Sequence, residues 1–391
     1  MTRVYKDLLI ITLFVLISTL LVWLPHLLAL QTFWGLSFKD GFNTIYRNFD
    51  GLEYIIIAKT FYDPLQIANI PQLLPHTYYA SHFPGFPILI VLFAPLLGFL
   101  KSMLFVSIIF TIASAITFYF MVRDFKLTTN PLLLTIIFLL LPARWIIVRS
   151  VGSPEPMFIF FVITSLFFFL KAIRHPFLIT HHSSLITSFI WLSAIFASFA
   201  QLTRPPGALL GLALGFYVLW QGYQKNSMKY ILAFYPFLLI PLTLLSVFYL
   251  YFLQYGDFFA YFHSGDNIHL TFPPFQIFNS TQFWVGTIWL EDIIYIYILG
   301  LLGGILLIKQ KLYPLAFFVL TFLTASFFVA HRDISRYTLP IAPFVIIAFQ
   351  HILVSKEFKI VLVILALALF LYSQNYIISN IAPVPDLSYY D

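Results

Sequence analysis

Residues 47–64 read Arg-Asn-Phe-Asp-Gly-Leu-Glu-Tyr-Ile-Ile-Ile-Ala-Lys-Thr-Phe-Tyr-Asp-Pro and follow the first long apolar segment of the chain. Three acids, Asp50, Glu53 and Asp63, lie in this stretch, although only 9% of all residues are charged and only 15 are acidic. An acidic side chain at the boundary between membrane and water can meet a lipid-borne substrate and an aqueous one together. We therefore expect the chemistry of the protein to lie here.

The composition around this stretch indicates an all-α polytopic membrane protein. Hydrophobic residues make up 61% of the chain and aromatic residues 20%, and continuous runs of about 20 apolar residues span a bilayer as helices. A transmembrane β-barrel is excluded because its strands would alternate in polarity. The chain has no cysteine, which excludes disulfides, thiolate chemistry and cysteine-bound metals.

Eleven apolar segments are long enough to be predicted as transmembrane helices. A further apolar segment, residues 83–100, begins Phe-Pro-Gly-Phe-Pro and is either a twelfth span or a helix lying against the membrane. The distribution of basic residues favours the helix at the membrane surface. The eleven predicted spans are residues 8–30, 102–122, 131–148, 157–171, 184–202, 206–221, 230–253, 285–307, 313–330, 338–354 and 359–378.

Basic residues determine the predicted orientation, since they favour the cytoplasmic ends of spans. With the N-terminus in the cytoplasm, 12 of the 21 basic residues lie at cytoplasmic ends with only three acids, Asp7, Asp124 and Glu357. This distribution accounts for the net charge of +6, so no nucleic-acid partner is expected. The twelve bases are Arg3, Lys6, Arg123, Lys126, Lys171, Arg174, Lys225, Lys229, Lys309, Lys311, Lys356 and Lys359.

The same topology predicts one integral membrane domain over residues 1–391, with its working surface facing outward. A long first outer loop, residues 31–101, is expected to carry interfacial helices, and a second outer loop covers residues 254–284. The first span exceeds the apolar core of a signal peptide and has no small-residue cleavage site, so it is predicted to be a retained anchor.

The position of Asp50 allows two interpretations, one structural and one functional. An Asp followed three residues later by Glu53 is typical of a helix N-terminus, where both side chains cap the first turn. On such a helix Asp50, Glu53 and Tyr54 share a face. The functional reading makes Asp50 a general base toward an acceptor hydroxyl.

Two further motifs of the outer side can be structural or functional. The stretch His-Phe-Pro-Gly-Phe-Pro at 82–87 is either a surface turn with aromatic anchors or the lining of a cavity that includes His82. Glu155 stands between Pro154 and Pro156 and is presented rigidly. It either contacts a sugar or caps the span that follows.

Three arginines at outer span ends are candidates for binding phosphate. Arg204 lies between two spans with almost no loop, and a charge there usually faces a cavity or a partner. Arg332, Arg336 and Tyr337 form a second group, in which the planar guanidinium suits phosphate. The rival partners of these arginines are Asp333 and lipid headgroups.

Other polar groups give weaker indications. Adjacent histidines at 181 and 182 are poorly placed to share a metal ion. Residues 263, 266 and 269 (His, Asp, His) have a spacing that a metal site tolerates, but no second segment of the chain supplies further ligands. Glu291-Asp292 is expected to add to the outer acidic surface. The sequence contains no P-loop, dinucleotide-binding turn or Ser-His-Asp signature.

Five motifs together resemble the GT-C superfamily of glycosyltransferases, most closely the GPI mannosyltransferase II-like (PIG-V-like) branch and its prokaryotic relatives. Phe-Asp-Gly-x-x-Tyr-x-x-Ile-Ala-x-x-x-Tyr at 49–62 resembles the family's Trp-Asp-Gly/Ala-x-x-Tyr-x-x-Ile-Ala element. Residues 82–87 resemble its Phe-Phe-Pro-x-Tyr-Pro. Ser-Pro-Glu155 is similar to an outer Ser-Glu-Ser, Thr-Arg204-Pro-Pro-Gly to Arg-Pro-x-Gly, and Ser-Arg336-Tyr-Thr-Leu-Pro to Arg-Tyr-x-x-Pro.

The resemblance implies transfer of a sugar, mannose or another hexose, from a polyprenyl-phosphate carrier to a glycan, lipid or protein acceptor on the outer or lumenal face, with inversion. It implies a plasma membrane location in a prokaryote or the endoplasmic reticulum in a eukaryote. No cofactor is predicted, although some relatives use a divalent metal. Asp50 becomes the base, and the predicted substrate-binding residues are Glu53, Tyr54, His82, Glu155, Arg204, Arg332, Arg336 and Tyr337.

Departures from the family pattern and one rival class remain. Phe49 replaces the family's Trp, and Pro154 and Pro156 interrupt its Ser-Glu-Ser, which leaves the acceptor and the sugar open. The alternative is a transporter or flippase of a lipid-linked saccharide, which would place charges deep within spans and contain broken, repeat-related helices. A non-catalytic scaffold would give no reason for these charged residues to share one face.

Overall fold

The computed structural model describes residues 3–72, 74–174, 184–265, 270–286, 290–383 and 386–391, and this part of the chain is helical without an extended strand. The longer helices are α1 (Arg3–Leu27), α5 (Gly85–Leu97), α6 (Phe99–Asp124), α9 (Glu155–Arg174), α10 (Ser184–Thr203), α11 (Gly207–Gln224), α13 (Leu239–Tyr255), α15 (Glu291–Lys309), α16 (Tyr313–Ser326) and α20 (Lys356–Ser379).

Short helices fill the connections between them. Between the first span and α5 lie α2 (Asn43–Tyr46), α3 (Gly51–Thr60), α4 (Pro64–Ala68) and the 3₁₀ helix η1 (His76–Ser81). The others are α7 (Pro131–Leu140), α8 (Ala143–Val148), α12 (Met228–Leu232), η2 (Tyr235–Leu238), α14 (Ala260–His263), η3 (Gln276–Phe278), α17 (Ile334–Tyr337), η4 (Leu339–Ile341), α18 (Ala342–Ala348), α19 (Gln350–Leu353) and η5 (Ser388–Tyr390).

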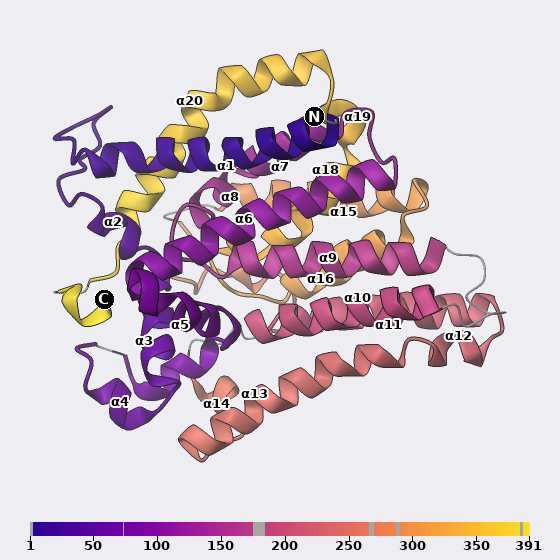
Figure 1. The fold of residues 1–391 in the computed structure, drawn as a ribbon, viewed down its shortest axis with the longest axis horizontal. Coiled ribbons are helices and arrows are strands. Elements are labelled where there is room, and N and C mark those ends of the chain that lie inside the picture. The colour runs from indigo at the N-terminus through magenta and orange to yellow at the C-terminus, as the bar shows by residue number, and fades with distance from the viewer. Residues whose placement is uncertain (1–2, 73, 175–183, 266–269, 287–289, 384–385) are drawn as a thin grey trace.

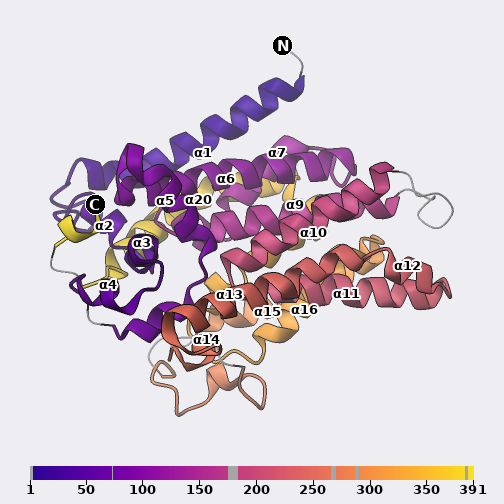
Figure 2. The same ribbon diagram turned by 60° about the horizontal axis from the view of Figure 1, so that its bottom comes forward.

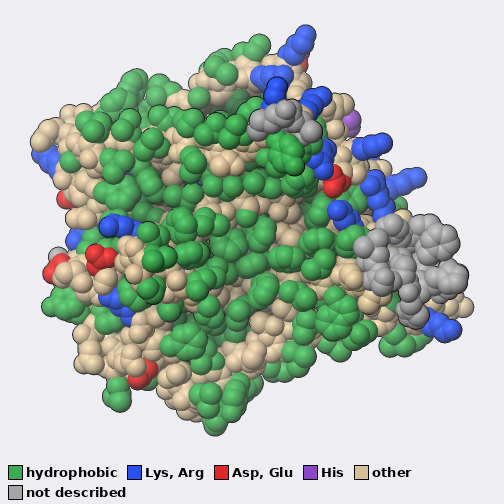
Figure 3. All heavy atoms as spheres, in the orientation of Figure 1, with side chains coloured by type: hydrophobic (Ala, Val, Ile, Leu, Met, Phe, Trp, Pro, Cys, Tyr) green, Lys and Arg blue, Asp and Glu red, His purple; other side chains and the backbone are tan. Residues whose placement is uncertain are grey.

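The long helices lie side by side, with two different ends to the bundle. The N-terminus, α12 and α19 lie at one end, whereas α2, α3, α4, α14 and the C-terminus gather at the other (Figures 1 and 2). Between the ends the visible surface is largely hydrophobic, and Lys and Arg side chains concentrate toward the end that holds the N-terminus (Figure 3). A band of apolar surface with one basic rim fits a bilayer and the positive-inside rule.

Six described helices are long and apolar enough to cross a membrane, which makes this an integral membrane protein; they are α1, α6, α9, α13 with η2, α15 and α20. Every one of the eleven predicted spans overlaps at least one helix, but three of them are interrupted. Residues 131–148 form α7 and α8, 230–253 form α12, η2 and α13, and 338–354 form η4, α18 and α19. Prolines such as Pro142 and Pro236 contribute to these breaks because they lack a backbone N–H. The number of eleven spans stays a prediction.

Helix α5 occupies the segment that was expected to lie on the membrane surface. Its 13 residues extend about 20 Å, less than the roughly 30 Å of a hydrocarbon core. Gly98, with φ +77°, ends it, and α6 starts at the next residue. The N-terminus of α5 approaches α10 so closely that a Cβ on Gly85 would meet the Leu202 carbonyl oxygen at 2.8 Å. This contact brings residues 82–87 beside Arg204.

Candidate active site

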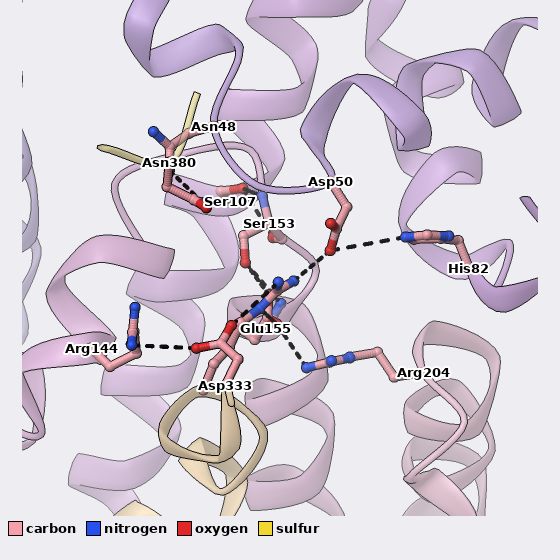
Figure 4. Close-up of polar contacts among 11 residues, drawn as sticks. Asn48, Asp50, His82, Ser107, Arg144, Ser153, Glu155, Arg204, Asp333 and Asn380 are labelled. Atoms are coloured by element: carbon pink, nitrogen blue, oxygen red, sulfur yellow. Dashed lines mark hydrogen bonds and ion pairs between the residues drawn. The ribbon is translucent and has the colours of Figure 1, made fainter. Parts of the chain in front are cut away.

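Asp50 lies immediately before α3 but does not cap it. Its side chain makes no capping hydrogen bond to the first turn; instead Oδ2 accepts a hydrogen bond from Arg336 Nη2 at 2.9 Å and lies 3.9 Å from His82 Nε2 (Figure 4). Asp63 is the residue that caps a helix, since its carboxylate accepts the Leu65 N–H at the start of α4. The predicted helix start after Asp50 is therefore confirmed, but the Asp50 side chain does not cap this helix.

Glu155, the first residue of α9, has no exposed surface. Its Oε1 accepts hydrogen bonds from Arg204 Nη1 at 2.8 Å and from Arg336 Nε at 2.6 Å, and Ser153 Oγ donates to Oε2. Both arginines thus converge on one carboxylate. In this arrangement Glu155 fixes the two guanidinium groups and is not itself open to a sugar.

A third acid joins the network through a residue that the sequence analysis missed. Asp333 lies 3.9 Å from Arg336 Nη1 and 3.3 Å from Arg144 Nη2, so the expected pairing of Asp333 with the arginines exists. Arg144 also donates to Ser335 Oγ and lies 3.8 Å from the ring centre of Tyr376. Arg144 could have been identified from its position inside the predicted span 131–148, because a charged residue within a span usually has a partner or a function.

The network balances its formal charge, because three carboxylates (Asp50, Glu155 and Asp333) face three guanidinium groups (Arg144, Arg204 and Arg336). Of the three acids Asp50 is the most accessible, with 33% of its side chain exposed against 13% for Asp333 and none for Glu155. Burial acts to raise the pKa of Asp50, but Arg336 and His82 outweigh it and hold that pKa well below its usual range. Asp50 is therefore an ionised acid that a substrate can reach.

A small polar cavity opens on this network. Its volume is about 50 Å³, enough for one or two water molecules. Its lining consists of Asp50, Tyr54, Ser81, His82, Arg204, Pro205, Pro206, Tyr261, Arg336 and Tyr337. The walls come from α3, η1, the turn between α10 and α11, α14 and α17, so that five predicted site residues besides Asp50 meet there: Tyr54, His82, Arg204, Arg336 and Tyr337.

Contacts from the end of α20 hold the chain just before Asp50. Asn48 Nδ2 donates to the Ile377 carbonyl at 2.6 Å, and the Ala382 N–H donates to the Arg47 carbonyl at 2.8 Å. Asn380 Nδ2 adds a bond to Asn48 Oδ1 at 3.4 Å (Figure 4). These bonds fix the position of the loop that presents Asp50.

Three predicted site residues do not line the cavity: Glu155, which lies behind the two arginines, Arg332 and Glu53. Arg332 is exposed, with its guanidinium 5.8 Å from the ring centre of Phe283. Glu53 lies near η1 and the C-terminal segment: burial raises the pKa values of Tyr79 and Tyr390, and the nearby Glu53 carboxylate raises both further. Asp50 and Tyr54 therefore share the cavity, while Glu53 does not.

The described residues contain no group of three or more His, Asp or Glu side chains that could hold a metal ion together. At the cavity, Asp50 and His82 are the two nearest candidates for ligands, and Glu155 is already enclosed by two arginines. His263 pairs instead with Asp257 at 2.6 Å. Residues 181, 182, 266 and 269 lie outside the described part of the chain.

The sequence matches no protein-family model and no curated protein. Its structure is similar to ArnT from Cupriavidus metallidurans bound to undecaprenyl phosphate, with a TM-score of 0.59 and 14% identity over 91% of this chain and 63% of ArnT. It is also similar to the archaeal oligosaccharyltransferase AglB from Archaeoglobus fulgidus, in complex with an inhibitory peptide and a dolichol-phosphate. There the TM-score is 0.53, with 13% identity over 98% of this chain and 56% of AglB.

The chain shares the membrane fold of these proteins. It spans less than two thirds of the length of ArnT and AglB. The predicted all-α membrane fold is confirmed, and ArnT and AglB share it. The closer resemblance to the GPI mannosyltransferase II-like branch stays a prediction.

Proposed function

We propose that this protein is a membrane glycosyltransferase that moves a sugar from a polyprenyl-phosphate carrier to an acceptor on the outer or lumenal face, with inversion. The observation that carries the proposal is the cavity in which an accessible carboxylate, Asp50, faces Arg204 and Arg336. The shared fold adds support, since ArnT binds undecaprenyl phosphate and AglB a dolichol-phosphate. The sugar is proposed to be mannose or another hexose, and the acceptor a glycan, lipid or protein.

The proposed reaction assigns a role to each side of the cavity. Asp50 acts as a positioned general base and removes the proton from the acceptor hydroxyl. At the same time the oxygen of that hydroxyl attacks the anomeric carbon of the donor sugar. Arg204 and Arg336 stabilise the negative charge on the leaving polyprenyl phosphate. Both arginines are fixed by Glu155 before the substrate arrives, so little reorganisation is needed when the charge develops. No step in this scheme requires a metal.

The donor phosphate competes with Asp50 for Arg336. Arg336 already contacts all three acids of the network, and the formal charge of the network is zero. An incoming phosphate adds negative charge and takes over the Arg336 Nη2 donor, which frees Asp50 for the acceptor. The prenyl tail stays among the apolar surfaces of the helices, so only the head of the donor needs polar contacts.

A transporter of lipid-linked saccharides is the rival, and the three interrupted spans are a feature that it shares. The position of the charges favours the enzyme. Glu155 begins α9, Arg204 follows the end of α10, and Asp50 precedes α3, so these three residues lie at helix ends. The predicted topology assigns these ends to the outer side. A transport site would be expected near the middle of the spans.

The test is to incubate purified protein with a panel of polyprenyl-phosphate sugars and with lipid, glycan and peptide acceptors. We expect release of polyprenyl phosphate and labelling of one acceptor class, both abolished in Asp50→Asn. The rival predicts no chemical change, but movement of a labelled lipid-linked saccharide across vesicles that contain the protein. That second result, without release from any donor, would overturn the proposal.

A further inference from the structure

His82 is built into the cavity wall with one ring nitrogen left for chemistry. Only 6% of the residue is exposed, and its ring packs edge-on to Tyr54 at 5.0 Å and against Tyr78 at 5.5 Å between ring centres. Its backbone carbonyl accepts hydrogen bonds from the Tyr62 hydroxyl at 2.7 Å and the Tyr251 hydroxyl at 3.5 Å. The imidazole is therefore held in place from several sides.

The hydrogen bonds of Ser81 determine which nitrogen of His82 carries the proton. Ser81 Oγ lies 2.7 Å from the Tyr78 carbonyl oxygen, which can only accept, so the single hydroxyl proton of Ser81 goes there. Ser81 Oγ also lies 2.7 Å from His82 Nδ1 and must accept from it. Nδ1 thus carries a proton, and in the neutral ring the lone pair is on Nε2.

Nε2 points to the carboxylate that would activate the acceptor. It lies 3.9 Å from Asp50 Oδ2, which is too far for a direct hydrogen bond. Both groups line the same cavity of about 50 Å³, so that a water molecule or a hydroxyl between them can contact both. A protonated His82 would in turn face the negative charge of Asp50.

Asp50 alone is poorly suited to keep a proton. The positive charge of Arg336 stays beside Asp50 even when the donor phosphate takes over their hydrogen bond, and this charge favours the ionised form of Asp50. A carboxylate held in that form retains a proton weakly. Histidine is the side chain that generally exchanges protons near neutral pH.

We propose that His82 is the final proton acceptor of the transfer step, paired with Asp50; this rests on the proposed glycosyl transfer. The acceptor oxygen forms a bond to the anomeric carbon, and the bond from that carbon to the phosphate oxygen breaks with its electron pair leaving on polyprenyl phosphate. The hydroxyl proton passes to Asp50 and from there, through a water molecule that bridges the 3.9 Å between the two groups, to His82 Nε2. The resulting imidazolium then releases the proton to water, which restores the pair for the next turnover.

Two substitutions of His82 separate proton transfer from positioning. Asn keeps a donor near the Nδ1 position for Ser81, and Gln places an amide near the Nε2 position, but neither side chain takes up a proton. We expect both variants to lower kcat by about 10²–10⁴-fold, the range for loss of an acid–base group, with little change in the KM for donor. Exogenous imidazole should partly restore turnover in His82→Ala. The control is His76→Gln, which changes an exposed histidine on η1 outside the cavity.

Each outcome decides the proposal. Normal kcat in His82→Gln, while wild-type protein is active, would overturn the role of His82 and leave the glycosyltransferase proposal standing. A lowered kcat in His82→Asn together with a kcat near the wild-type value in His82→Gln would also overturn it. In that case a neutral hydrogen-bonding group near the Nε2 position would be enough for turnover. Loss in both variants without imidazole rescue of a folded His82→Ala protein would indicate positioning only. Failure of wild-type protein in every transfer assay would instead contradict the proposed function itself.

Discussion

At the scale of single residues, Asp50 is the strongest test of catalysis. Asp50→Asn keeps the size of the side chain but removes its charge, and Asp50 makes no capping bond that the fold would lose. We expect turnover to fall by about 10²–10⁴-fold, as for loss of a general base, while donor still binds because Arg336 loses its competitor. Turnover, donor binding and thermal unfolding should be measured together.

The matched control for this substitution is Asp63→Asn, which changes a half-buried cap of α4 outside the cavity. It should leave turnover unchanged and lower stability by at most about 1 kcal/mol, the usual size of a cap effect. If Asp50→Asn retained more than about a tenth of wild-type turnover, well above the loss expected for a base, Asp50 would not be the base.

The arginines bind phosphate in the proposed function, and Arg336 gives the sharpest prediction. Arg204→Ala and Arg336→Ala should each weaken binding of polyprenyl phosphate by about 1–3 kcal/mol, the range for charge-assisted hydrogen bonds. Arg336→Ala also leaves the fully buried Glu155 with one cationic partner fewer, and removing a partner from a buried ion pair is strongly destabilising.

Arg336→Lys therefore makes the cleaner measurement. Lysine keeps the positive charge but cannot contact Glu155, Asp50 and Asp333 with separate nitrogens of a planar fork. We expect a folded protein with weaker donor binding, measured as Kd for polyprenyl phosphate. Arg332→Lys should have the affinity of the wild type, since Arg332 lies over Phe283 and outside the cavity. Equal affinities in both lysine variants would remove Arg336 from the phosphate site.

At the scale of elements, the contact between α5 and α10 positions two walls of the cavity. A Cβ on Gly85 would lie 2.8 Å from the Leu202 carbonyl oxygen and 2.9 Å from Thr203 Cα, both backbone atoms. Gly85→Ala should therefore push the helices apart and cost about 1–3 kcal/mol of unfolding free energy, the range for overpacking. Because His82 and Arg204 adjoin this contact, turnover should fall as well.

Gly215→Ala on α11 is the matched control, because nothing lies within 4 Å of the added Cβ. Alanine is the better helix former, so this variant should be as stable as the wild type or up to about 1 kcal/mol more stable. Thermal unfolding and turnover of the two variants give the comparison. A Gly85→Ala protein that behaved like Gly215→Ala would show that the close approach does not constrain the site.

At the scale of the whole molecule, the prediction concerns topology. The chain has no native cysteine, so single cysteines at positions 101, 124 and 226 can be labelled from one side of the membrane. Because α5 is shorter than a bilayer core and the basic turns share one end, we expect position 101 to be labelled from outside and positions 124 and 226 to be protected. Protection of 101 together with outside labelling of 124 would invert the topology and contradict the model of residues 83–100 as interfacial.

The sequence by itself determined the class of the protein and most members of the site. Continuous apolar runs require helices in a membrane, and rare charges in such a chain, including Asp50, Arg204 and Arg336, are expected to have partners or functions. These are local properties of composition and pattern. Helix breaks were harder to predict, because the pattern that defines a span continues through residues such as Pro142.

Only the tertiary structure decided which charges pair. Glu155 accepts hydrogen bonds from Arg204, which is 49 residues away in the sequence, and from Arg336, which is 181 residues away. Asp50 and Arg336 are hydrogen-bonded although 286 residues separate them in the sequence. No local pattern specifies such partners, since they depend on how α3, α9, α10 and α17 pack. The packing decided between the alternatives that the sequence left open: Asp50 is an accessible carboxylate without a capping bond, and Glu155 is the buried anchor of two arginines. It also added Arg144, because a buried ion network must balance its charges and only the folded chain brings Arg144 to Asp333.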